Sequence, residues 1–130
     1  MKEDIKFLPV EGVYLTVAME TDGGWKVYLI NRNSQHLSNV MVTSKGYGDK
    51  EGAKQKTSVL RHMFPLVESG EYALIEPIDK SVFHLTNEYW VSFFIDKQVY
   101  DKKYLFVPDS ITEENLSYIP EINLHGVLHE

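Results

Sequence analysis

The segment of residues 45–56 contains the residue types best suited to binding chemistry. It holds three glycines, Tyr47 and four lysines between two apolar runs. Glycine lets backbone N–H groups approach an anion, lysine supplies positive charge, and a tyrosine ring offers a face for stacking. The spacing does not match the G-x-x-x-x-G-K-[ST] phosphate loop. We therefore consider binding of a small anion or RNA, with contacts from Lys45, Tyr47, Lys54, Lys56 and, on the next predicted strand, Arg61.

The same segment also fits a simpler interpretation. A mobile, charged hairpin tip between two strands commonly carries lysines, because their charges keep a sheet edge soluble. His62 follows Arg61, and the sequence does not fix which way either side chain faces. Both interpretations of residues 45–56 stay open at this point.

Other kinds of reactive site are poorly supported. The chain has no cysteine, which excludes a disulfide, a thiolate metal site and a cysteine nucleophile. No serine lies in a G-x-S-x-G turn. His125 and His129 have the spacing of a helical metal pair, but they lie in a terminal segment that contains Gly126. We expect no catalytic residues, no metal ligands and no cofactor.

Three aromatic residues of the last predicted strand, Tyr100, Tyr104 and Phe106, fall on one face by alternation. Facing inward, they would belong to the core. Facing outward, they would form an apolar surface suited to a protein partner or to a homodimer. The sequence leaves this orientation open.

Alternating apolar and polar residues indicate β-structure along most of the chain. Asp22-Gly23-Gly24 is a turn sequence that joins the first two runs, and Asp96-Lys97-Gln98 joins the last two. The predicted strands cover residues 13–20, 25–30, 39–44, 57–64, 72–75, 89–96 and 99–107.

Seven short strands without helix-strand alternation favour an all-β fold, an antiparallel immunoglobulin-like β-sandwich. We predict one domain over residues 1–130, with a mobile loop at 45–56, helical turns at 79–85 and 110–116, and an irregular tail at 117–130. The first turn would be capped by Asp79, and the second has a capping-box pattern that begins at Ser110. Tyr89 is either the corner tyrosine of such domains or an ordinary strand aromatic.

The charge and the amino terminus suggest where such a protein acts. The formal net charge of −6 opposes general attraction to nucleic acid or to anionic lipid. The charged first residues precede an apolar stretch that ends at Val10 and is too short for a signal peptide or a membrane span. Together with the lack of cysteine, this predicts a soluble, cytoplasmic protein that does not bind membranes.

Several segments resemble a family of small uncharacterised bacterial proteins, some of them labelled as an alpha subunit of phenylalanyl-tRNA synthetase. The similarity runs from about Ile5 to Pro108. A synthetase alpha subunit has a catalytic domain larger than this chain, with a G-x-G-x-G-x-x-R signature that the sequence lacks, so the resemblance implies no catalytic residues. It rests on Val-Tyr-Leu-Ile-Asn at 27–31, Val-Thr-Ser-Lys-Gly-Tyr-Gly at 42–48, Thr-Ser-Val-Leu-Arg-His at 57–62, Asn-Glu-Tyr-Trp-Val-Ser at 87–92 and residues 100–108.

Two functional interpretations follow. The first is a non-catalytic interaction or structural module that presents loops or an edge strand to a protein partner or to a second copy of itself. The second is binding of a small anion or RNA through residues 45–56, in the manner of a synthetase accessory protein. Salt dependence separates them, because phosphate contacts weaken steeply as salt rises whereas apolar burial does not.

Overall fold

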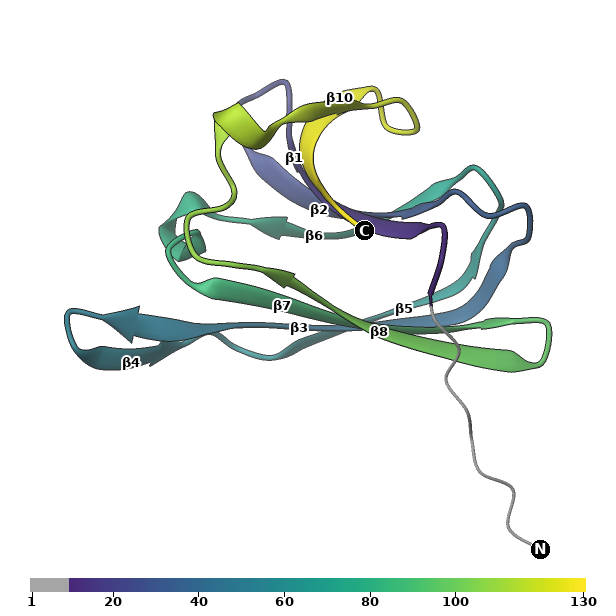
Figure 1. Cartoon of the computed structure of the whole chain (residues 1–130), viewed down its shortest axis with the longest axis horizontal. Helices are drawn as coiled ribbons and strands as arrows, with labels where there is room; N and C mark the ends of the chain where they lie inside the picture. Colours follow the sequence, from purple (N-terminus) through teal and green to yellow (C-terminus); the bar gives the residue numbers. More distant parts are fainter. Residues whose placement is uncertain (1–9) are drawn as a thin grey trace, which may run out of the picture.

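The computed structural model describes residues 10–130, which form two β-sheets packed face to face (Figure 1). The expectation for residues 1–9 lies outside this range. Two 3₁₀ helices, η1 (Lys80–Val82) and η2 (Glu113–Asn115), occur in the connections. The strands of the described part are β1 (Val13–Met19), β2 (Trp25–Asn31), β3 (Leu37–Lys50), β4 (Ala53–Lys56), β5 (Leu60–Val67), β6 (Tyr72–Ile78), β7 (Thr86–Ile95), β8 (Gln98–Phe106), β9 (Ser117–Ile119) and β10 (Leu124–His129).

All strand pairs are antiparallel. The upper sheet of Figure 1 has the order β6-β2-β1-β10-β9, and the lower sheet has the order β4-β3-β7-β8. Strand β5 pairs with the part of β3 that β4 leaves free. The all-β sandwich is therefore confirmed, and its immunoglobulin-like character stays a prediction. Neither short helix of residues 10–130 has the length and apolar character needed to cross a bilayer.

The main core lies between the sheets and is built by alternation. Leu15 and Leu29 of the upper sheet, and Val42 and Val91 of the lower sheet, are completely or almost completely buried. Each such side chain stabilises the fold by roughly 1.5–3 kcal/mol relative to an exposed one. The Tyr104 hydroxyl donates a 2.7 Å hydrogen bond to the backbone oxygen of Val13, which ties the two sheets together inside the core.

The aromatic face of β8 is directed inward. Tyr104 and Phe106 are buried, and Tyr100 is half-buried and stacked on Phe93. The prediction of an interface at Tyr100, Tyr104 and Phe106 is therefore wrong for the two buried rings, because β8 is an edge strand whose apolar side faces the opposite sheet. Tyr89 is also a core residue and not a corner tyrosine, since no hydrogen bond joins its hydroxyl to the backbone of residues 10–130.

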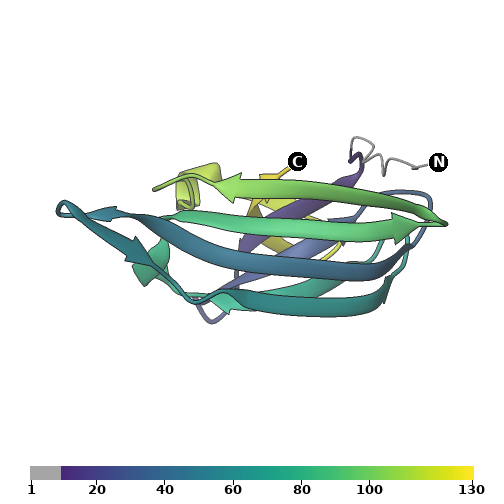
Figure 2. The same cartoon turned by 90° about the horizontal axis from the view of Figure 1, so that it is seen from below.

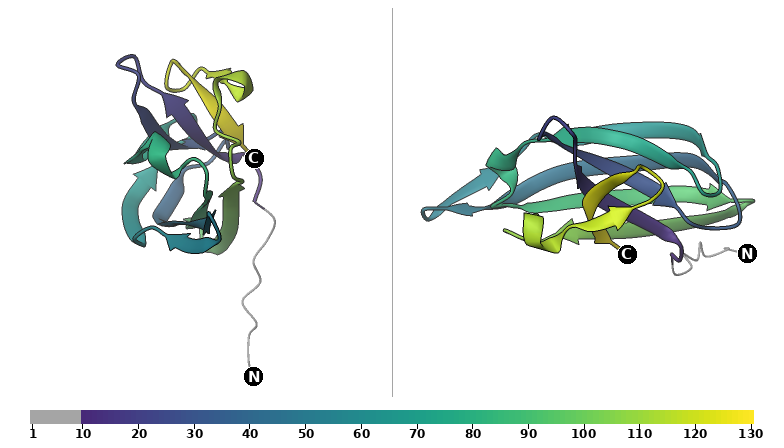
Figure 3. Two further views of the ribbon diagram at one scale, coloured as in Figure 1. Left: turned by 90° about the vertical axis from the view of Figure 1, so that its left-hand side faces the viewer. Right: turned by 90° about the horizontal axis from the view of Figure 1, so that it is seen from above.

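The carboxyl-terminal residues form two strands instead of the expected irregular tail. Strand β10 pairs with β1 from Leu15 opposite His129 to Met19 opposite His125. Figure 3 shows that the β9–β10 segment curls over the outer side of the upper sheet. There it covers a second apolar cluster, in which Ile119 packs with Ala18, Tyr28 and Ile30. The sequence signal is weak because β9 is short and because β10 includes Gly126.

Residues 45–56 form a β-hairpin arm instead of a loop. Strand β3 continues to Lys50, and β4 returns beside it, with Lys50 opposite Ala53. Glu51 and Gly52 both have positive φ, of 52° and 81°, which is the geometry of a two-residue hairpin turn. Figure 1 shows the arm extending beyond the end of the sandwich. The turn was missed because Glu-Gly is not the usual sequence for it.

The two predicted helical turns are shorter than expected. Asp79 caps η1, and its carboxylate accepts a 2.8 Å hydrogen bond from the Ser81 backbone N–H, as predicted. At η2 the capping box is absent: Thr112 occupies the cap position without a side-chain hydrogen bond, and the Ser110 hydroxyl donates to the Val107 oxygen instead. The capping-box prediction is therefore wrong.

Candidate functional site

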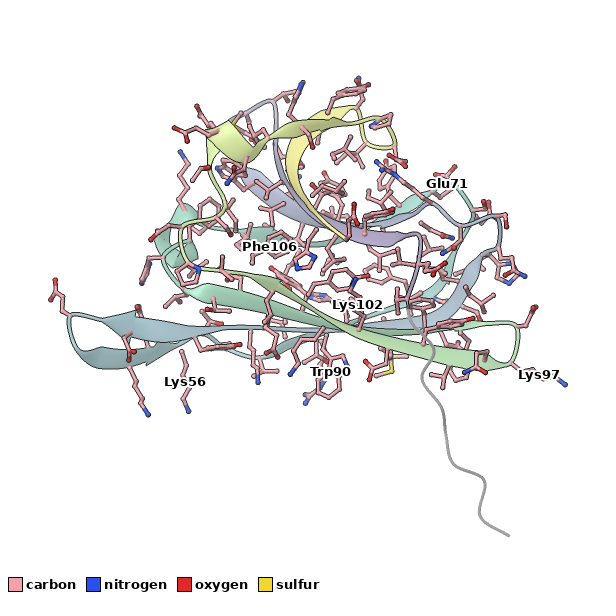
Figure 4. All side chains as sticks on the ribbon, viewed as in Figure 1. Lys56, Glu71, Trp90, Lys97, Lys102 and Phe106 are labelled. Atoms are coloured by element: carbon pink, nitrogen blue, oxygen red, sulfur yellow. The ribbon has the colours of Figure 1, made fainter. Side chains whose placement is uncertain are left out.

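The predicted binding residues gather on the outer face of the lower sheet. Tyr47 lies opposite Lys56, and Arg61 lies opposite Thr43, so these side chains project from the same side as Lys45. In Figure 4 Lys56 and Trp90 both point away from the upper sheet. We call this surface the lysine-aromatic face. Its side chains are Met41, Lys45, Tyr47, Asp49, Lys54, Lys56, Arg61, Met63, Glu88, Trp90, Phe94, Asp101, Lys103 and Leu105.

Large apolar side chains are exposed on this face. Met63 has 70% of its surface accessible, Trp90 48% and Met41 43%, and Phe94 and Leu105 are also exposed. Figure 2 shows the strands of the lower sheet side by side, with no other element of residues 10–130 in front of them. The upper sheet differs, because β9 and β10 cover its outer side. Contiguous exposed apolar side chains rimmed by polar groups are typical of an interaction surface.

Glu88 organises the charges of the face. Only 6% of this residue is exposed, although it lies on the outer side of the sheet. Its carboxylate accepts a 3.2 Å hydrogen bond from the Tyr47 hydroxyl and lies 3.5 Å from the Lys45 ammonium and 3.8 Å from that of Lys103. Burial raises the pKa of the Tyr47 phenol, and the hydrogen bond and negative charge of Glu88 raise it further. The phenol therefore stays a hydrogen-bond donor at neutral pH.

Two lysines also lie against the two rings of the face. The Lys45 ammonium is 5.8 Å from the centre of the Tyr47 ring, and the Lys103 ammonium is 5.1 Å from the Trp90 ring. The indole N–H of Trp90 donates to the Asp101 carboxylate. Such cation–π contacts stabilise by about 0.5–1 kcal/mol at exposed sites. Both rings are held in place, and one side of each is already occupied by a cation.

The face is basic on an acidic chain. The face carries five cationic side chains and only three carboxylates, those of Asp49, Glu88 and Asp101. The whole chain, in contrast, has a formal net charge of −6. Lys54, Lys56 and Arg61 are exposed and form no ion pair with any residue of the described part. These three cations are available to an incoming acidic group.

A break between β4 and β5 creates a depression in the face. Thr57 bridges it: its N–H donates to the Gly46 oxygen at 2.9 Å, and its hydroxyl accepts from the Gly46 N–H at 2.6 Å. The depression has a volume of about 380 Å³ and is lined by Lys45, Tyr47, Lys56, Val59 and Glu88, together with Gly46 and Thr57. Most of the sequence-predicted contact residues border it.

The other side of the arm is held by a histidine. His84, in the connection from η1 to β7, places its Nε2 atom 2.7 Å from the Oε1 atom of Gln55 on β4. Lys54 and Lys56 flank Gln55 on β4, and by alternation their side chains point to the opposite side of the strand. The bond to Gln55 therefore holds the strand that carries two of the free lysines. The contact ties the arm to the connection between η1 and β7.

Ser44, Glu76 and His62 meet between the edges of the two sheets. The Glu76 Oε1 atom accepts from the Ser44 hydroxyl at 2.6 Å and lies 2.8 Å from His62 Nε2. In a hydrolytic triad the histidine contacts the serine hydroxyl as a base. Here the carboxylate separates them, so the group links β3, β5 and β6 without activating a nucleophile. Within residues 10–130 no three His, Asp or Glu side chains are placed to hold a metal ion.

Trp90, Lys103 and Glu88 were missed by the sequence analysis. A signal for them exists in the β7–β8 hairpin, whose turn consists of Asp96 and Lys97, with Ile95 opposite Gln98. The predicted turn included Gln98 and is therefore one residue too long. Counting outward from the shorter turn places Lys103 opposite Trp90.

Comparisons with known protein families, with curated proteins and with solved structures find no match to this chain.

Proposed function

We propose that this protein is a non-catalytic interaction module whose lysine-aromatic face binds an acidic protein segment that carries apolar side chains. The observation that supports the proposal is the combination of exposed Met63, Trp90 and Phe94 with the free cations Lys54, Lys56 and Arg61 on one uncovered sheet. Apolar contacts supply the affinity, and the cations select an acidic partner.

Charge complementarity favours an acidic partner over a second copy of the chain. A symmetric dimer through this face would bring the same patch of each copy together. Because five cationic side chains stand against three carboxylates on the face, both apposed patches would carry a net positive charge, which costs free energy. A partner with carboxylates between its apolar side chains does not meet this repulsion.

The arrangement of the rings favours protein over RNA. Single-stranded nucleic acid binds by stacking bases on open aromatic faces along a basic groove. On this face Lys45 lies against the Tyr47 ring and Lys103 against the Trp90 ring. Glu88 also places a carboxylate between the two lysines, where a phosphate would be repelled. Anion or RNA binding at residues 45–56, in association with a synthetase, is the alternative outcome of the test.

The test is a titration of the isotope-labelled protein, followed by backbone amide chemical shifts. The probes are a blocked octapeptide of alternating Glu and Phe, the same peptide with Lys in place of Glu, and a uridine decanucleotide. We expect saturable chemical-shift changes on the lysine-aromatic face with the acidic peptide. The dissociation constants of the other two probes should be at least tenfold larger. A moderate salt dependence is expected, since only part of the interaction is electrostatic.

Three results would contradict the proposal. Tighter binding of the uridine decanucleotide than of the acidic peptide would assign the face to nucleic acid. A dimer in sedimentation analysis that dissociates on Trp90→Ser substitution would assign it to self-association. Equal binding of the acidic and basic peptides would remove the role of Lys54, Lys56 and Arg61.

A further inference from the structure

A second cavity lies on the inner side of the β4–β5 break, between the edges of the two sheets. It has a volume of about 200 Å³. This is smaller than the roughly 300–1,000 Å³ of sites for drug-sized ligands, so only a compact group fits. Its polar lining includes Ser44, Glu76, Asn87 and Tyr89, and its apolar lining includes Leu60 and Ile78.

A tyrosine that lines this cavity has a hydroxyl without a partner among the described residues. Tyr89 is 2% exposed, and no hydrogen bond from residues 10–130 reaches its hydroxyl. The other buried tyrosine of the lower sheet, Tyr104, has its hydroxyl satisfied by a backbone oxygen. Burial raises the pKa of the Tyr89 phenol, and the negative charge of Glu76 raises it further, which places that carboxylate in its neighbourhood. The hydroxyl keeps contact with the solvent of the cavity, so a bound ligand can form a hydrogen bond with it.

The other polar atoms of the cavity are mostly acceptors. Glu76 uses its Oε1 atom for Ser44 and His62, and its Oε2 atom forms no hydrogen bond with the described residues. Asn87 donates its amide hydrogens to the backbone oxygens of Val82 and Leu85, at 3.0 and 3.3 Å, which leaves its side-chain oxygen as an acceptor. A ligand here must therefore supply donors.

The charges around the cavity favour a cation. Two carboxylates line it, those of Glu76 and Asp79. The only basic residue in the lining of the described part is Lys45, and its ammonium lies on the opposite side of the sheet beside Glu88. His62 approaches Glu76 from β5 but is not part of the lining. Apart from His62, no basic side chain of residues 10–130 forms an ion pair with the Glu76 carboxylate.

We propose that this cavity binds a compact primary ammonium group carried on a short apolar chain. The ammonium donates to the Glu76 carboxylate, to the Tyr89 oxygen and to the Asn87 side-chain oxygen, and the chain contacts the apolar residues of the rim. A free alkylamine and a lysine side chain share this chemistry. The inference does not depend on the lysine-aromatic face, which lies on the other side of the sheet.

The test is a titration of the labelled protein with butylammonium chloride at pH 7, with 1-butanol as the neutral control of the same shape. We expect saturable shifts at residues 76–79 and 87–89 with the ammonium, and at least tenfold weaker binding of the alcohol. A blocked Gly-Lys-Gly peptide provides the second source. Tighter binding of either amine supports a cation site and identifies the source, and binding of neither overturns the proposal.

Two variants and a control locate the site. Glu76→Gln keeps an acceptor for Ser44 and removes the charge, and we expect at least tenfold weaker binding of butylammonium. Tyr89→Phe keeps the core ring, and loss of one hydrogen bond should weaken binding about fivefold. The control is Glu71→Gln, which removes an exposed carboxylate at the other end of β6 (Figure 4) and should leave binding unchanged.

The result that overturns the inference is equal affinity of Glu76→Gln and wild type for butylammonium, or equal affinity of the wild type for the ammonium and the alcohol. Circular dichroism establishes that each variant is folded. If Glu76→Gln does not fold, Tyr89→Phe decides, because its substitution retains the packing of the core.

Discussion

The Tyr47 hydroxyl lies 3.2 Å from the Glu88 carboxylate, and this contact joins β3 to β7 on the outer side of the lower sheet. Glu88 is nearly buried at a position where alternation places it toward solvent. It is covered by the side chains that it attracts, those of Tyr47, Lys45 and Lys103. The lysine-aromatic face is therefore ordered before a partner arrives, which lowers the entropy cost of binding.

We expect Glu88→Ala to lower the free energy of unfolding by about 1–2 kcal/mol, because it leaves the Tyr47 hydroxyl and two ammonium groups without their shared acceptor. Urea denaturation measures the change. Glu71→Ala, at an exposed position, is the matched control and should change stability by less than about 0.5 kcal/mol. A loss at Glu88 no larger than that of the control would show that Glu88 does not organise the face.

Tyr104→Phe should destabilise the protein by about 1–2 kcal/mol at pH 7, because the Val13 oxygen in the core loses its donor. Burial raises the pKa of the Tyr104 phenol, so the folded state keeps the proton above pH 10 while the unfolded state ionises near its ordinary pKa of about 10. The stability contributed by this group is complete below pH 10 and is lost as pH rises toward the raised pKa. The difference between wild type and Tyr104→Phe should therefore shrink between pH 10 and 11, as measured by denaturation at each pH. A constant difference would refute this linkage.

Gly126→Ala should destabilise the fold by about 1–3 kcal/mol, because an added Cβ would overlap the Thr16 hydroxyl on the neighbouring strand. Thr16 offers a test of that cause, since its hydroxyl is buried and has no hydrogen-bond partner. The double variant Thr16→Ala/Gly126→Ala should recover most of the loss in a double-mutant cycle. Additive effects of the two substitutions would contradict the pairing of β10 with β1.

His84→Ala should loosen the hairpin arm, because it removes the 2.7 Å contact with Gln55. Amide hydrogen exchange is the appropriate measurement, since it reports local opening. We expect exchange of the β4 amides to accelerate severalfold while the amides of β7 keep their protection. Faster exchange throughout the lower sheet would indicate global destabilisation and not release of the arm.

The local part of the fold could be predicted from the sequence. Alternation in β1 and β2 and the Asp22-Gly23-Gly24 turn gave the first hairpin, because both signals lie within a few residues of the contacts that they specify. The orientation of β8 could not be predicted: its two sides both carry large side chains, such as Tyr104 and Leu105. Only the position of the opposite sheet decides which side is buried.

Only the part of the candidate site that is local in sequence could be predicted. Lys45, Tyr47, Lys54 and Lys56 are close in sequence, so they can be grouped even when their hairpin is predicted as a loop. Glu88 and Trp90 join them only through the pairing of β3 with β7, across more than 40 residues of chain. Contacts at such separation depend on the topology of the whole sheet, which no local pattern encodes.

The most direct test of the lysine-aromatic face compares two exposed lysines that Figure 4 labels, Lys56 on the arm and Lys97 in the β7–β8 turn. The measurement is the dissociation constant of the blocked Glu-Phe octapeptide for Lys56→Glu and for Lys97→Glu, which carry the same change of charge. We predict that Lys56→Glu weakens binding by about fivefold or more at moderate salt, whereas Lys97→Glu stays within about twofold of wild type. Equal weakening by both variants would mean that the peptide responds only to net charge, and it would contradict a binding site on this face.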